Sequence, residues 1–96
     1  MLYCEKIIFS GHAIQRMFER KISREDIQAA LADGEIIAEY PEDLPFPSLL
    51  VCGNPAGMPL HIVVAINHKN QSCYIITTYI PTADKWTDSF RTRRET

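Results

Sequence analysis

The sequence lacks the features of a membrane-spanning, exported or metal-binding protein. No apolar run approaches the roughly 18–20 residues that a bilayer-spanning helix needs, and the first residues lack the basic-then-apolar pattern of an export signal. The cysteines are odd in number, form no C-x-x-C pair and lie in apolar surroundings at Cys4, Cys52 and Cys73. This pattern predicts three reduced core thiols in a cytoplasmic protein, without a structural zinc.

The sequence also lacks an excess of positive charge. Its formal net charge is −2, which disfavours strong nonspecific binding to nucleic acid. The charges are unevenly distributed, however. Residues 6–24 carry five bases and one acid, residues 33–43 carry five acids and no base, and the last residues contain Arg91, Arg93 and Arg94. A locally basic surface therefore requires the first basic segment and the C-terminal arginines to meet in space.

The segment SGHAIQRMFERKI, residues 10–22, predicts an amphipathic helix. Ser10 can cap its N-terminus by accepting a hydrogen bond from the Ala13 amide. At about 100° per residue, four polar side chains share one arc of this helix: His12, Arg16, Glu19 and Arg20. The apolar stripe lies opposite them. Two interpretations stay open, because these side chains can form an anion-binding face or simply an Arg16–Glu19 surface pair.

The remaining pattern predicts an α+β domain. Ser23 begins a second helix with a capping box, and Gly34 is expected to end it in the left-handed conformation. The predicted order is β-α-α-β-β-β-β, an antiparallel sheet with two helices on one face. The expected strands are residues 2–9, 35–40, 48–52, 60–67 and 72–80. Residues 1–90 are predicted to form this single domain, followed by a basic tail at 91–96.

Two side-chain arrangements follow from these predicted elements. If Asn67 pairs with Cys73, His61 lies opposite Tyr79 on the same face of the sheet. Trp86 and Phe90 are four residues apart and could dock one helical turn against the sheet.

Several motifs resemble one family of small bacterial proteins of unassigned function, which is grouped with the RelE/ParE-type toxins of toxin–antitoxin pairs. The opening motif is SGHA followed by RM and ERKIS, within residues 10–23. Later motifs are GEII at 34–37, YPED at 40–43, PLHIV at 59–63 and YIP at 79–81 with Trp86. The resemblance implies a RelE/ParE-like fold, which agrees with the element order predicted above.

The resemblance also implies an endoribonuclease that cleaves mRNA, often on the ribosome, without a metal or another cofactor. This reaction needs proton carriers and cationic donors around a phosphate. The candidate catalytic residues are His12, Glu19, His61 and Tyr79. The candidate substrate-binding residues are Arg16, Arg20, Trp86, Arg91 and Arg93, with Trp86 suited to stack on a base.

A second reading of the same sequence is a non-catalytic protein-binding module. A toxin normally has an antitoxin partner, whose acidic side chains would cover the basic helix or tail. Each candidate residue also has an ordinary structural role: His61 can be a core histidine, Tyr79 and Trp86 can be packing residues, and the arginines can be a solvated tail. A metal site from His12 and His61 is disfavoured, because their spacing matches no known ligand pattern.

Overall fold

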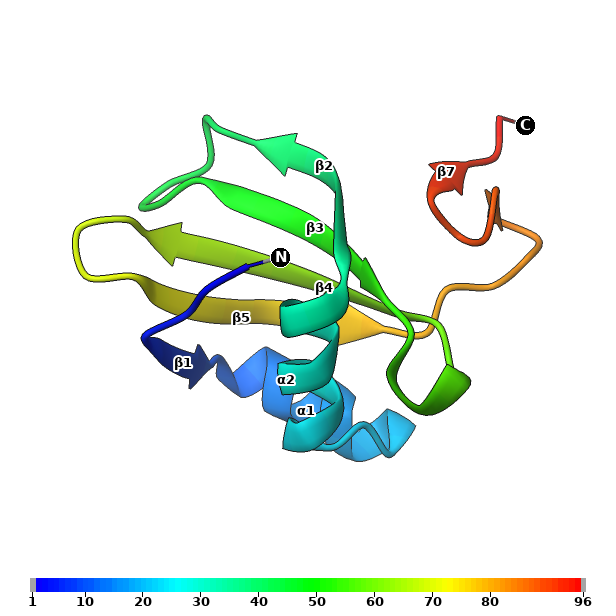
Figure 1. The fold of residues 1–96 in the computed structure, drawn as a ribbon, viewed down its shortest axis with the longest axis horizontal. Coiled ribbons are helices and arrows are strands. Elements are labelled where there is room, and N and C mark those ends of the chain that lie inside the picture. Colours follow the sequence, from blue (N-terminus) through cyan, green and yellow to red (C-terminus); the bar gives the residue numbers. More distant parts are fainter. Residues whose placement is uncertain (1, 96) are drawn as a thin grey trace.

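The computed structural model describes residues 2–95 and shows a mixed five-stranded sheet with two helices on one face (Figure 1). The elements run in the order β1 (Lys6–Phe9), α1 (Gly11–Arg20), α2 (Arg24–Asp33), β2 (Glu35–Tyr40), β3 (Ser48–Gly53), η1 (Pro55–Gly57), β4 (Leu60–Asn67), β5 (Ser72–Tyr79), β6 (Trp86–Thr87) and β7 (Thr92–Arg93). The α+β class is therefore confirmed. The predicted element order is incomplete, because it lacks the short 3-10 turn η1 and the two strands that follow β5.

The sheet is mixed and not antiparallel as predicted. Its strand order is β1-β5-β4-β3-β2, and β1 runs parallel to β5 while the other pairs are antiparallel. A parallel pair requires a crossover connection between its two strands, and here that connection comprises both helices and three strands. β1 itself is also shorter than the predicted strand over residues 2–9.

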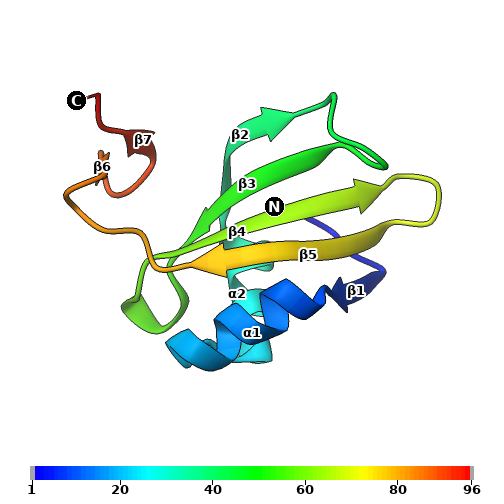
Figure 2. The same cartoon turned by 180° about the vertical axis from the view of Figure 1, so that it is seen from behind.

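The helices are held to the sheet by one apolar core. The residues of β4 that face the helices are fully or nearly buried and pack with Ala13 and Met17 of α1 and with Ile27, Ala30 and Leu31 of α2. β4 is the central strand, as its apolar character on both faces predicts. Figure 2, seen from behind, shows the sheet in front of α2, with β6 and β7 beyond one end of the strands.

Both helix caps form as the sequence predicts, but the end of α2 differs. The Ser10 hydroxyl accepts from the Ala13 amide at 3.0 Å, and Ser23 and Asp26 form a reciprocal capping box. Gly34 is extended, with φ −78°, and not left-handed. Glycine is required there by close approach, because a Cβ atom would lie 2.2 Å from the Ala30 carbonyl oxygen.

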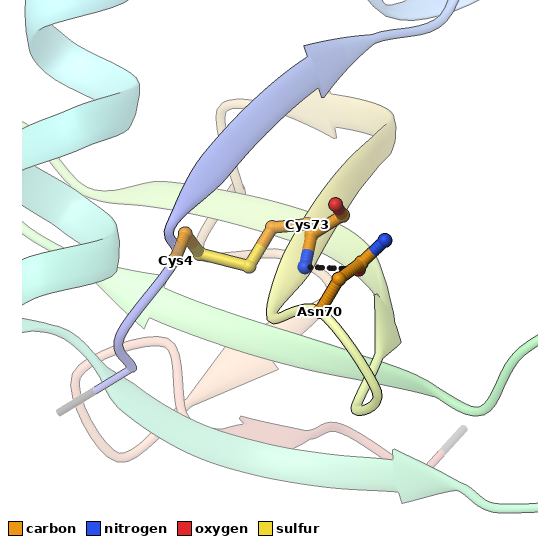
Figure 3. Close-up of a disulfide and its surroundings, with 4 residues drawn as sticks. Cys4, Asn70 and Cys73 are labelled. Carbon is orange, nitrogen blue, oxygen red and sulfur yellow. Dashed lines mark hydrogen bonds between the residues drawn. A yellow bond between two sulfur atoms is a disulfide. The ribbon is translucent and has the colours of Figure 1, made fainter.

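The cysteine prediction is wrong for two of the three thiols. Cys4 and Cys73 form a disulfide that joins the segment before β1 to the start of β5, next to the turn that contains Asn70 (Figure 3). Cys52 is free and half-buried. The disulfide reinforces the parallel β1–β5 pair, which is the longest-range strand pairing in the chain.

The last residues form a hairpin and not the predicted helical turn. Trp86 pairs with Arg93 and Thr87 with Thr92, so two residues of the predicted basic tail belong to β7. Three successive residues in the connecting loop, Asp88, Ser89 and Phe90, have positive φ values between 54° and 70°. This left-handed turn directs the Phe90 carbonyl back toward β4, where it reaches His61.

Candidate functional site

The candidate site lies at the end of the sheet where β4 begins and β5 ends. His61 and Tyr79 are opposite one another there, as predicted, but the register differs from the premise of that prediction. Asn67 pairs with Ser72 and not with Cys73. If this register continued unchanged along the two strands, His61 would lie opposite Thr78. A bulge in β5, opposite Val63 and Val64, leaves Ile76 without a partner and restores the pairing of His61 with Tyr79.

His61 is enclosed by three aromatic or backbone groups. Its Nδ1 lies 3.1 Å from the Tyr79 hydroxyl, and its Nε2 lies 2.8 Å from the Phe90 carbonyl oxygen. The Trp86 ring meets the imidazole edge-on, with centroids 4.4 Å apart. With an exposed fraction of 0%, His61 has no direct contact with solvent in this conformation.

These hydrogen bonds fix the tautomer of the imidazole. A carbonyl oxygen can only accept, so His61 Nε2 carries the proton and donates it to Phe90. In the neutral ring Nδ1 is then an acceptor, and it receives the Tyr79 O–H. Burial lowers the pKa of His61 below its ordinary value, although the hydrogen bond to the Phe90 carbonyl opposes that shift. The imidazole is therefore a neutral base at pH 7.

A pocket of about 420 Å³ opens beside this dyad. Its lining residues come from the end of α1, the end of β5, the connection to the hairpin and the hairpin itself: Arg20, Tyr79, Ile80, Pro81, Thr82, Lys85, Trp86 and Arg93. The lining contains three cationic side chains and no acidic one. Arg93 also lies over the Trp86 ring, with its guanidinium carbon 5.7 Å from the centroid.

Tyr79 links the pocket to the buried imidazole, because its side chain lines the pocket and its hydroxyl reaches His61. Burial raises the pKa of Tyr79, and the nearby Arg93 partly offsets that increase. The phenol is accordingly protonated at neutral pH. It can pass a proton between a molecule in the pocket and His61 Nδ1.

The structure thus brings together five of the nine predicted site residues and separates the other four. Arg20, Tyr79, Trp86 and Arg93 line the pocket, and His61 lies beneath them. Arg16 and Glu19 form the surface pair that was the alternative interpretation, at 2.9 Å, and His12 is exposed on the same helix. Arg91 pairs with Glu35 at 2.9 Å and lines a different cavity, of about 510 Å³, together with Cys52.

Sequence reasoning missed two residues of the site. Lys85 is a third cation of the pocket, and Phe90 supplies a backbone carbonyl that no sequence pattern could reveal. The position of Lys85 next to Trp86 in a segment otherwise read as polar was the available signal. Within residues 2–95 there is no group of three or more His, Cys, Asp or Glu side chains suited to a metal ion.

Stability is expected to fall in acid because of His61. Its pKa lies below 6.5 in the folded protein, so the unfolded chain takes up this proton first as the pH decreases. The free energy of unfolding should therefore decrease from about pH 6.5 downward and level off below the folded-state pKa. Urea unfolding of the wild type and His61→Gln between pH 7.5 and 5 measures this loss. The variant should lose less stability over that range, while His68→Gln, in an exposed turn, should behave like the wild type.

The comparisons with known proteins identify a family but no activity. No curated protein and no solved structure matches the chain. No helix within the described residues is long and apolar enough to cross a bilayer. A family model described as a domain of unknown function, DUF4258, matches residues 9–80, which cover most of the sheet and both helices. The chain therefore belongs to the DUF4258 family.

Proposed function

We propose that this protein is an RNA-directed toxin of the RelE/ParE type, a metal-independent endoribonuclease that binds its substrate in the pocket lined by Arg20, Lys85 and Arg93. The sequence resemblance to that group supports the proposal. The proposal implies a cytoplasmic protein with mRNA or the ribosome as its target and an antitoxin as its regulator.

The observation that carries the proposal is the convergence of cations and aromatics on one pocket. Arg20 comes from α1, Lys85 directly precedes β6 and Arg93 belongs to β7, so residues far apart in sequence meet there. Guanidinium groups bind phosphate oxygens with two parallel hydrogen bonds, and an exposed indole face can stack on a base. A phosphate with its adjoining nucleoside matches this combination of groups.

The Tyr79–His61 pair supplies the proton transfer for such a substrate. The ribose 2′-OH attacks the adjacent phosphorus and gives its proton to the Tyr79 oxygen, while Tyr79 gives its own proton to His61 Nδ1. The 2′-oxygen–phosphorus bond forms, the bond from phosphorus to the 5′-oxygen breaks, and that oxygen leaves with a proton from Lys85 or water. The products are a 2′,3′-cyclic phosphate and a 5′-hydroxyl. The three cations stabilise the negative charge on the phosphoryl oxygens.

The second candidate function is a binding module without catalysis. The complete burial of His61 under Trp86 and the Phe90 carbonyl favours it, because such an imidazole also satisfies all the requirements of a core residue. In that case the basic pocket would recognise an anionic partner and leave it intact.

The decisive experiment uses purified protein and an end-labelled mRNA, in one preparation with intact ribosomes in Mg²⁺ and in another without ribosomes in the presence of EDTA. We expect cleavage that leaves 2′,3′-cyclic phosphate ends, reduced about 100-fold by Arg93→Ala and unchanged by Lys69→Ala, which removes an exposed turn lysine. RNA binding without cleavage would refute the nuclease proposal and favour a module that binds without catalysis. If the RNA is neither cleaved nor bound in a salt-sensitive manner in either preparation, the RNA-directed proposal is refuted.

A further inference from the structure

The outer edge of β2 is an open sheet edge at the opposite side of the sheet from β1. β2 is last in the strand order, so one side of its backbone has no strand partner within residues 2–95. Natural sheets commonly protect such edges with proline, lysine or a very short strand. The segment EIIAEY contains no proline or lysine and extends over six positions, with one bulge between Ile36 and Ala38, whereas β1 has four residues and begins at Lys6.

An apolar pocket of about 430 Å³ adjoins this edge. Ile36 of β2 lines it with Leu49, Ile66 and Leu2, and Pro41 and Pro47 complete its walls. Ile36 is 39% exposed, and no residue of β2 is fully buried. An apolar side chain of a bound segment would therefore cover Ile36 and fill a preformed pocket.

The charge of this edge is negative and favours a positively charged occupant. Glu39 stands at the rim of the pocket and Glu42 is exposed just beyond β2. Residues 33–43 contain five acids and no base. Glu35 is paired with Arg91 and Asp43 binds the Ser48 hydroxyl, but Glu39 and Glu42 have no ion pair in the described part of the chain. Two uncompensated carboxylates thus flank the pocket.

We propose that the β2 edge binds an extended segment of a partner protein, which adds to the sheet as a sixth strand. The segment inserts an apolar side chain into the Ile36 pocket and places lysine or arginine side chains against Glu39 and Glu42. Main-chain hydrogen bonds supply affinity in this recognition mode, and the pocket supplies specificity. The last residues of β2 point away from the hairpin (Figure 1), and the Ile36 pocket shares no lining residue with the basic pocket, so a bound segment leaves the basic pocket open.

Charge also argues against two other occupants. A second copy paired antiparallel through β2 would bring Glu39 and Glu42 of both chains to one seam, where like charges repel. RNA is a polyanion and would be repelled by the same carboxylates. A basic polypeptide is the occupant that neutralises them.

Fluorescence anisotropy with a labelled synthetic peptide of alternating lysine and valine tests the proposal. We expect saturable binding to the wild-type protein and new protection of β2 amides from hydrogen exchange. Ile36→Lys places a positive charge at the apolar pocket, where it would repel the basic peptide. This change should weaken binding at least about tenfold. Glu39→Gln should weaken binding severalfold, and the matched control Glu25→Gln, on α2, should leave it unchanged.

Two comparison peptides make the outcome decisive. A peptide with N-methylated backbone amides should fail to bind, and one with glutamate in place of lysine should bind far more weakly. Equal binding of the N-methylated peptide would overturn strand addition, and equal binding of the acidic peptide would overturn the charge argument. A wild-type dimer in sedimentation that Ile36→Lys converts to monomer would show instead that a second copy occupies the edge.

Discussion

Removing the Cys4–Cys73 disulfide should lower the free energy of unfolding by about 4 kcal/mol. The bond closes a loop with a sequence separation of 69 residues, and the chain-entropy model gives this magnitude for a loop of that length. A domain of this size is typically stable by about 5–15 kcal/mol, so the loss would consume a large part of its stability. Urea unfolding with and without a thiol reductant measures the difference.

Two variants separate the crosslink from the packing of its sulfur atoms. Cys4→Ala with Cys73→Ala should be as unstable as the reduced protein or slightly less stable, because Cys73 is fully buried and its truncation leaves a small cavity. Cys52→Ala should respond to the reductant as the wild type does. Three titratable thiols in the native, unreduced protein would contradict the predicted bond.

The secondary structure could be predicted from the sequence because its signals are local. Ser10 and Ser23 cap their helices through hydrogen bonds that span three residues. The apolar side chains on both faces of β4 indicate a strand that is buried on both faces. The parallel pairing of β1 with β5 could not be predicted, since nothing near Lys6 or Ser72 specifies a partner at that separation. The same limit explains the missed disulfide, which depends on that pairing.

The candidate site shows a similar division between local and long-range information. The polar arc of α1 was correct as a helix pattern, but its middle faces solvent. Of the apolar residues of α1, Ala13 and Met17 pack in the core, whereas Ile14 and Phe18 are exposed. Only Arg20, at the end of the helix, extends to the end of the sheet where the hairpin lies. His61 and Tyr79 were paired correctly although the assumed register was wrong by one residue, because a bulge in β5 compensated for it. The hairpin itself was missed, since its left-handed turn contains no glycine to mark it.

The dyad assignment predicts a large and selective effect of Tyr79→Phe. This change keeps the aromatic ring and removes the hydroxyl that connects the pocket to His61 Nδ1. RNA cleavage should fall about 10²–10⁴-fold, the usual contribution of a positioned proton carrier, while RNA affinity should change by no more than about twofold. Single-turnover cleavage rates and filter binding measured on the same preparations give both quantities.

A control in the same strand tests whether the hydroxyl acts through chemistry or through packing. Tyr74→Phe removes a hydroxyl from the tyrosine that stacks on Phe46, outside the basic pocket, and should leave the cleavage rate unchanged. The wild-type rate should fall in acid only below the ordinary histidine range, because the base is an imidazole with a lowered pKa. Tyr79→Phe should lose this acid limb together with the activity. If Tyr79→Phe cleaved RNA at the wild-type rate, His61 and Tyr79 would form only a structural pair. The nuclease proposal would then need another base.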